Sequence, residues 1–250
     1  MSKAHPMNIP MVVRSLDVKK DIFQPREDNE ELLGPEVSYL SAIGALMYLV
    51  NNTRPDITFL VNLLASYSSS STKRHWNGVK HVLRYLRGTV DIGFFYSNKS
   101  NFDLVGYADA GYLSDPHKAK FQIGYLFTCG ETTISWQSVK QTMTVTSLNH
   151  AEILAIHETS RECVWLRSMT HHIRETCGFS FSKNLSTILF ENNTACIPQI
   201  KGEYIKGDRI KYISPKLFYT HDLEENGDIS VQQILQKTTW RTYSQKHYPH

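Results

Sequence analysis

The sequence predicts an α/β protein, in which a mixed five-stranded sheet with flanking helices follows a small helical segment. Two observations carry this prediction. Apolar residues recur every three or four positions between residues 35 and 89, which is the period of helices that pack on a core. From about residue 102, short runs rich in β-branched and aromatic residues alternate with helical patterns in the order βββ-α-β-α-α-β.

Three helices are expected in the first segment. Pro35 suits the first turn of a helix, and the stretch 53–56 ends that helix. Pro55 can start the second helix, which ends in the serine run 68–71. Thr72 is expected to cap the third helix. The apolar face predicted for this third helix consists of Trp76, Val79, Leu83 and Leu86.

The strands of the second segment are separated by short turn signals, which favours antiparallel hairpins at its start. The expected strands cover residues 104–109, 123–128, 133–137, 186–191 and 229–234. Turns are predicted at Gly111, at 114–116 and at 129–130. The expected helices are a long one over 149–175, a short one near Thr194 and another over 215–224.

Composition sets modest limits on the class of protein. The chain has 250 residues, of which 41% are hydrophobic and 20% charged, as in packed globular proteins. The four cysteines form no CxxC pair and are expected to be free thiols. The N-terminus lacks the apolar core of a signal peptide, and no apolar run reaches the roughly 18 residues of a membrane helix. We therefore expect a soluble intracellular protein, cytoplasmic or nuclear.

Three polar residues are candidates for a catalytic site. Asp109 follows an apolar strand, Glu152 opens a helical run, and Asn192 follows the fourth expected strand. Asp109 at the end of its strand, Glu152 in a first helical turn and Asn192 are expected to converge where strands and a helix end meet. Hydrolysis of phosphodiesters with two metal ions needs clustered carboxylates, with the metals about 3.5–4 Å apart. A neutral amide at Asn192 weakens such a cluster.

Basic residues on the third helix and in a later loop are candidates for nucleic-acid contact. Lys73, Lys80, Arg84 and Arg87 are spaced so that they project from one side of the helix. A solvated helix face is the alternative explanation. The loop carries Lys201, Lys206, Arg209 and Lys211, which suit a nucleic-acid backbone and equally suit a solvated loop.

The chain resembles the C-terminal part of copia-type long-terminal-repeat retrotransposon Pol polyproteins of plants. The resemblance rests on motifs in the expected order: YLSAIGALMYLVNNTRPDI (39–57), RHWNGVKHVLRYLRGT (74–89), LVGYADAGYLSD (104–115), ISWQSVKQT (134–142), NHAEILAIHE (149–158), ECVWLR (162–167) and ISPKLFYTHDL (213–223). It implies an irregular arm (1–34), a thumb- or connection-like tail of reverse transcriptase (35–100), an RNase H-like domain (102–235) and a degenerate tail (236–250). The polymerase portion is missing, since no adjacent Asp pair occurs.

The resemblance also implies roles for the candidate site residues. Asp109 and Glu152 fall on metal ligands of the family, which uses Mg²⁺ or Mn²⁺ to cleave the RNA strand of RNA–DNA hybrids. Asn192 falls on the third ligand position, and Glu191 is expected to point to the opposite side of the strand. The fourth ligand position falls in 236–250, where the sequence has no Asp or Glu.

Two missing carboxylates predict a degenerate nuclease, because Mg²⁺ strongly favours carboxylate ligands. Three hypotheses follow for the function. The first is an RNase H-type endonuclease with a weakened site. The second is a catalytically inactive domain that still binds RNA–DNA hybrid or duplex, and the third is a transposon fossil without a selected role.

Overall fold

The computed structural model of the chain describes residues 5–10, 21–35, 37–96, 103–115, 120–130, 132–141, 147–178, 186–202 and 213–234. The chain divides into two compact units, one built mainly on Met1–Phe95 and the other on Tyr96–Ser114 and Lys120–Thr239. Within the described residues, no helix is long and apolar enough to cross a membrane. The four cysteines are free thiols, as expected.

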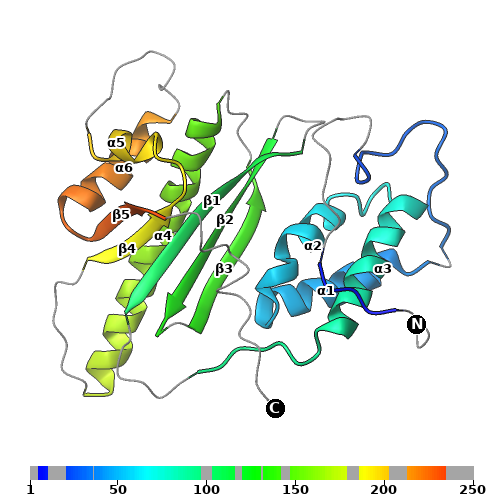
Figure 1. Ribbon diagram of the computed structural model, residues 1–250, viewed down its shortest axis with the longest axis horizontal. Coiled ribbons are helices and arrows are strands. Elements are labelled where there is room, and N and C mark those ends of the chain that lie inside the picture. The colour runs from blue at the N-terminus through cyan, green and yellow to red at the C-terminus, as the bar shows by residue number, and fades with distance from the viewer. Residues whose placement is uncertain are drawn as a thin grey trace. The chain divides into compact units, whose positions relative to one another are not determined.

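The first unit is helical (Figure 1). Its elements are α1 (Tyr39–Asn52), the 3₁₀ helix η2 (Pro55–Ile57), α2 (Thr58–Ala65) and α3 (Lys73–Gly88). Pro55 starts η2, as its fixed φ and missing N–H favour. Pro35, in contrast, starts no helix, because α1 begins at Tyr39 after Ser38. The described part of the arm before α1 contains neither helix nor strand beyond an isolated bridge between Leu32 and Thr72.

A buried charge network ties the turn before η2 to the end of α3. The Arg54 guanidinium donates to both carboxylate oxygens of Asp56, at 2.9 and 2.7 Å. It also donates to the carbonyl and hydroxyl oxygens of Thr89, at 3.1 and 2.7 Å. The Tyr85 hydroxyl donates to Asp56 at 2.7 Å. Each charge is paired and hydrogen-bonded, which is the condition under which charges are tolerated in a core.

Helix α3 begins where expected, but its buried face is shifted from the predicted one. Thr72 caps the helix together with the His75 ring, whose Nδ1 accepts from the Thr72 N–H at 3.1 Å. Only Val79 of the predicted apolar face is fully buried. The buried positions are His75, Gly78, Val79, Val82 and Tyr85. His75 is therefore a core residue, stacked on Tyr67 at 4.2 Å between ring centroids, and not part of a cationic surface.

The second unit has the predicted α/β architecture with a mixed five-stranded sheet. Its elements are β1 (Leu104–Asp115), β2 (Lys120–Cys129), β3 (Thr132–Lys140), α4 (Leu148–Thr176), β4 (Thr187–Glu191), α5 (Cys196–Ile200), α6 (Ser214–Glu225) and β5 (Ile229–Gln233). The strand order is β3-β2-β1-β4-β5. Strands β2 and β3 are antiparallel, whereas β4 runs parallel to both β1 and β5.

One predicted turn is absent from the sheet. Strand β1 continues through Gly111 to Asp115, so Asp109 lies inside the strand and not at its end. Pairing with neighbouring strands overrides the local turn preference of glycine, since strand formation depends strongly on context. The turn predicted at 129–130 is confirmed, because Gly130 has a φ of 56° between β2 and β3.

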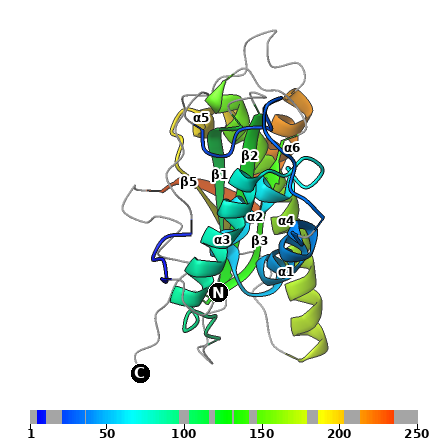
Figure 2. The same ribbon diagram turned by 90° about the vertical axis from the view of Figure 1, so that its right-hand side faces the viewer.

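Helix α4 runs along one face of the sheet (Figures 1 and 2). Its buried side packs against β2 and β4, and its length agrees closely with the predicted helix over 149–175. Helix α6 packs beside α4. The core beneath these helices includes Phe127 from β2, Ile156 from α4, Leu189 from β4 and Leu217 from α6. This packing brings the start of α4 to the middle of β1.

Candidate functional site

The site forms where β4 ends beside β1. Residues Val105, Gly106 and Tyr107 pair in parallel with Ile188, Leu189 and Phe190. Glu191, the last residue of β4, therefore lies level with Ala108, one position before Asp109. Ligand sites of open α/β sheets gather at the carboxyl ends of such parallel strands.

Helix α4 supplies the second acid from the fifth position of the helix, one residue beyond its first turn. Ser147 caps the helix by accepting a hydrogen bond from the His150 N–H at 3.3 Å. Glu152 is 3% exposed, and its Oε2 accepts a hydrogen bond of 2.8 Å from the Ala110 N–H of β1. This bond fixes the Glu152 carboxyl group beside Asp109, as the sequence predicted for these two residues.

Glu191 supplies a third carboxyl group, so the prediction that it points away from the site is wrong. Its side chain is fully buried on the face of β4 that also buries Leu189, under α4. Its Oε1 accepts hydrogen bonds of 2.9 Å from the N–H groups of Asn192 and Asn193. The Glu152 carboxyl group lies within hydrogen-bonding reach. We call Asp109, Glu152 and Glu191 the acidic cluster.

Asn192 also reaches the site, but from outside the acidic cluster. Its side chain is exposed, and its Nδ2 donates to Asp109 Oδ1 over 3.1 Å. Both Glu191 and Asn192 reach the site because the chain bends at Asn192, where strict strand alternation no longer applies. Asn192 thus holds the Asp109 carboxylate, and the carboxyl group that joins Asp109 and Glu152 from β4 belongs to Glu191.

Burial and mutual repulsion disfavour ionisation of the acidic cluster. Burial first, then the charges of Glu191 and Asp109, raise the pKa of Glu152 to about 9. Burial also raises the pKa of Glu191 to about 8, against the lowering effect of the N–H groups of Asn193 and Asn192. The pKa of Asp109 is raised by burial, while the hydrogen bond from Asn192 lowers it. At neutral pH, Glu152 and Glu191 therefore both favour the protonated form.

The donor chemistry of the cluster fits a hard divalent cation such as Mg²⁺ or Mn²⁺, which prefers carboxylate oxygens. Glu191 Oε2 is buried without a fixed hydrogen-bond donor, so this oxygen is available to a proton or to a cation. Within the described part of the chain, however, no three His, Cys, Asp or Glu side chains are already placed to hold a metal ion together. Backbone donors engage Glu152 and Glu191, and the Asn192 amide engages Asp109. Binding a cation therefore requires these side chains to turn.

The basic residues predicted to contact nucleic acid belong to different units of the chain. On α3, Lys73 and Arg87 are exposed, while Lys80 and Arg84 are partly buried. Lys80 Nζ lies 5.8 Å from the centroid of the Trp76 ring. Lys201 is exposed after α5 and lies 3.9 Å from Glu224. Lys206 and Arg209, like the tail 236–250, lie outside the described residues.

Comparison with known proteins relates the chain to transposon polyproteins. No protein-family model matches it. It is 36% identical over 167 residues to the retrovirus-related Pol polyprotein from transposon TNT 1-94 of Nicotiana tabacum, which covers 67% of this chain and 12% of the polyprotein. It is 38% identical over 138 residues to the secreted RxLR effector protein 161 of Plasmopara viticola, which covers 55% of this chain and 97% of that protein.

Among solved structures, the LC11 RNase H1 in complex with an RNA/DNA hybrid aligns with 56% of this chain and 90% of its own chain. The sequence identity is 17% and the TM-score is 0.40. The sequence matches to the polyproteins confirm the resemblance found in the motifs. The chain belongs to the family of retrovirus-related Pol polyproteins from plant transposons and spans a small part of such a polyprotein.

Proposed function

We propose that the second unit is an RNase H-like domain related to two-metal hydrolysis of the RNA strand of RNA–DNA hybrids, and that its activity is strongly attenuated. The observation that carries this proposal is the convergence of Asp109, Glu152 and Glu191 at the end of β4. Kinship with Pol polyproteins supports nucleic acid as the substrate. The polymerase portion of such an element is the expected partner in the same polyprotein.

The acidic cluster is the proposed site for Mg²⁺ or Mn²⁺. A bound divalent cation would neutralise the carboxylates and supply an activated water. The carboxyl groups of Glu152 and Glu191 each accept hydrogen bonds from backbone N–H groups. The second oxygen of Glu191, Oε2, is buried and accepts no hydrogen bond from a fixed donor. Asn192 positions Asp109 through its amide and contributes no negative charge.

Attenuation follows from the way these side chains are held. Mg²⁺ demands near-ideal octahedral geometry, so ligands that must first reorient bind it weakly. The Asn192 amide occupies one oxygen of Asp109, and two backbone donors occupy one oxygen of Glu191. Three carboxylates also neutralise the four positive charges of two divalent ions incompletely. We expect slow cleavage that is faster with Mn²⁺ than with Mg²⁺, since Mn²⁺ is bound more tightly by a given set of ligands.

A hybrid-cleavage assay on the full chain tests this proposal. End-labelled RNA in an RNA–DNA hybrid is incubated with the protein and either cation, beside the variants Glu191→Gln and Asn192→Asp. We expect slow cleavage by the unmodified chain, none by Glu191→Gln and faster cleavage by Asn192→Asp. The exposed Glu175→Gln on α4 serves as the matched control and leaves the rate unchanged.

The outcomes separate the candidate functions. Absence of cleavage by the unmodified chain at high protein concentration with Mn²⁺ overturns the nuclease proposal. Cleavage by Asn192→Asp alone would assign the missing ligand to position 192 and make the native chain catalytically inactive. Cleavage that survives Glu191→Gln would remove Glu191 from the site.

The cationic side of α3 favours nucleic-acid binding as a second candidate function, independent of cleavage. Lys73 and Arg87 are exposed near the two ends of the helix, and Lys80 and Arg84 lie between them. We expect sequence-independent binding to hybrid or duplex that weakens steeply with salt, because phosphate contacts release counterions. Replacing Lys80 and Arg84 with Gln should lower the salt slope. An affinity that does not change between low and moderate salt contradicts this function.

A further inference from the structure

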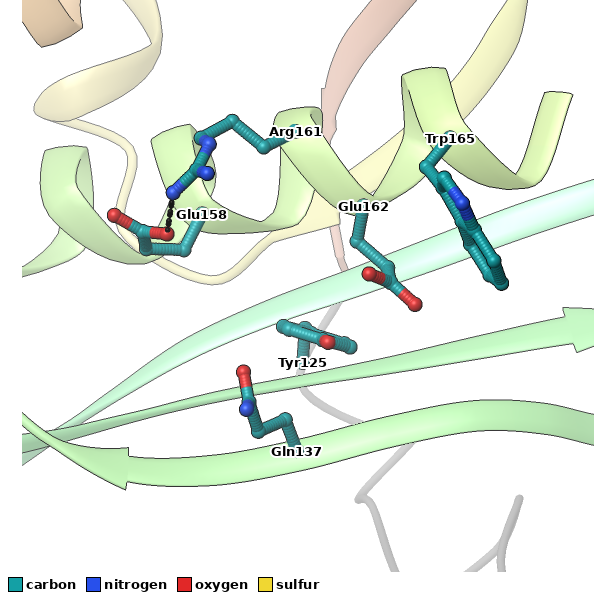
Figure 3. Close-up of a pocket in the computed structure, with 6 residues that line it drawn as sticks. All are labelled: Tyr125, Gln137, Glu158, Arg161, Glu162 and Trp165. Atoms are coloured by element: carbon teal, nitrogen blue, oxygen red, sulfur yellow. Dashed lines mark hydrogen bonds and ion pairs between the residues drawn. The ribbon is translucent and has the colours of Figure 1, made fainter. Parts of the chain in front are cut away.

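A cavity of about 540 Å³ lies between α4 and the hairpin of β2 and β3 (Figure 3). Its lining comes entirely from the second unit and consists of Tyr125, Gln137, Glu158, Arg161, Glu162 and Trp165. We call this cavity the α4 pocket. Glu162 lies ten residues along α4 from Glu152, which is roughly 15 Å in a helix. The α4 pocket is therefore a place separate from the acidic cluster.

Two aromatic rings and a carboxylate form one end of the α4 pocket. Figure 3 shows Tyr125 on β2, the Glu162 side chain pointing from α4 toward it, and the Trp165 side chain farther along the same side of α4. Trp165 is 53% exposed to solvent, which is unusual for so large an apolar residue. Glu162 accepts a hydrogen bond of 2.7 Å from Ser135 Oγ. A carboxylate has about four acceptor sites, so this bond leaves capacity for further donors.

At the other end of the pocket, Glu158 is paired with two cations. Its Oε2 accepts from Arg161 at 2.9 Å, and its Oε1 accepts from Lys216 at 3.2 Å. With Lys216 counted beside the lining, two carboxylates and two cations balance. Both cations lie at Glu158, whereas Glu162 has the neutral hydroxyl groups of Ser135 and Tyr125 as its partners. The aromatic end of the α4 pocket is thus suited to a single positive group.

An apolar stripe continues from the pocket along the same helix. Trp165, Met169 and Ile173 follow at intervals of four residues, so they lie on one side of α4. They are 53%, 42% and 53% exposed. Exposed apolar side chains next to a pocket of defined charge are typical of surfaces that bind another polypeptide.

We propose that the α4 pocket binds an arginine side chain of a partner polypeptide, whose apolar neighbours cover Met169 and Ile173. A guanidinium is planar, stacks on aromatic faces and matches a carboxylate with two parallel N–H groups. Trp165 and Tyr125 offer the faces, and Glu162 offers the carboxylate. A single-stranded nucleic acid would also stack on Trp165. Its phosphates, however, would face the Glu162 carboxylate beside Trp165, so the polypeptide fits better.

Peptide binding to the full chain tests this inference, which does not depend on nuclease activity. The probe is a fluorescein-labelled peptide, Ser-Leu-Arg-Leu-Ser, and its twin carries citrulline, the neutral isostere of arginine. Fluorescence anisotropy should show that the arginine peptide binds more tightly than its twin. Glu162→Gln should weaken the arginine peptide about tenfold, as expected for loss of a charged hydrogen-bond acceptor, and leave the citrulline peptide unchanged. Trp165→Ala should weaken both peptides.

Controls separate binding from folding. Glu175→Gln removes an exposed carboxylate from the same helix outside the pocket and should leave both affinities unchanged. Far-ultraviolet circular dichroism checks that Glu162→Gln and Trp165→Ala retain the helix. Equal affinities of the two peptides, or no peptide binding at millimolar protein, overturn the inference. Binding of oligothymidylate that is lost in Trp165→Ala would assign the pocket to nucleic acid and also overturn it.

Discussion

Replacing Glu191 with Gln is the sharpest test of the acidic cluster. The glutamine keeps an oxygen that can accept from the N–H groups of Asn192 and Asn193, which Glu191 Oε1 now engages at 2.9 Å. Its amide nitrogen can donate to the neighbouring Glu152. The substitution therefore preserves shape and hydrogen bonds while removing one ionisable group, and the difference it makes is electrostatic.

The magnitude follows from proton linkage. The pKa values of Glu191 and Glu152 rise from an ordinary 4.5 to about 8 and about 9 in the folded chain. Between about pH 4.5 and 9 the folded state thus holds more protons than the unfolded state, so the free energy of unfolding falls as pH rises. The loss is about 1.4 kcal/mol per pH unit for each proton retained. Each retained proton gives a loss of about 3 kcal/mol between roughly pH 5.5 and 7.5.

Urea unfolding, detected by hydrogen exchange in peptides from β4 and α4, measures this loss of unfolding free energy. Because both elements belong to the second unit, the measurement reports on that unit alone. The unmodified chain should lose stability between the two pH values, and Glu191→Gln should lose distinctly less. Addition of Mg²⁺ at the higher pH should stabilise the unmodified chain more than the variant. Glu175→Gln, exposed at the far end of α4, should behave like the unmodified chain. Equal pH slopes in the unmodified chain and Glu191→Gln would refute the reasoning.

Three further predictions concern stability. Asp56→Ala leaves the Arg54 guanidinium buried without its partner and should cost about 3–5 kcal/mol, measured as a lower thermal midpoint of the first unit. Gly106→Ala would place a Cβ within 2.5 and 2.6 Å of two core side chains and should cost about 1–3 kcal/mol by urea unfolding. Gly44→Ala is its counterpart, because an added Cβ there meets nothing within 4 Å, and in this exposed helical position it should stabilise by about 0.5–1 kcal/mol. A destabilised Gly44→Ala, or an unaffected Gly106→Ala or Asp56→Ala, would contradict these assignments.

The sequence predicted element type and order well where one local signal dominated. The long apolar period after residue 149 predicted α4 nearly to its ends, and Gly130 marked the β2–β3 turn. The prediction of elements from the sequence was wrong where a local signal competed with tertiary contacts. Gly111 favours a turn by itself, yet β1 passes through it as a central strand of the sheet, between β2 and β4 in the strand order.

The face of a helix was predicted less well than the helix itself. On α3, polar His75 lies in the core and is satisfied by hydrogen bonds to the Thr72 N–H and the Gln24 carbonyl. Trp76 lies only partly buried beside it. Hydrophobicity alone would place Trp76 in the core and His75 at the surface. The partners that make a buried histidine tolerable lie up to 51 residues away in the sequence and are invisible to a periodicity argument.

The role of Glu191 shows which part of a site depends on the fold as a whole. The strand TILFE has three consecutive apolar residues before its acid, as in parallel strands buried on both faces, so the sequence offers no alternation that separates inward from outward residues. The face is decided by the register of β4 against β1 and by α4, which covers Leu189 and hence Glu191. A polar residue that ends such a strand is therefore best assigned by the helix that packs above it, whereas position in the motif alone selects Asn192 and leaves out Glu191.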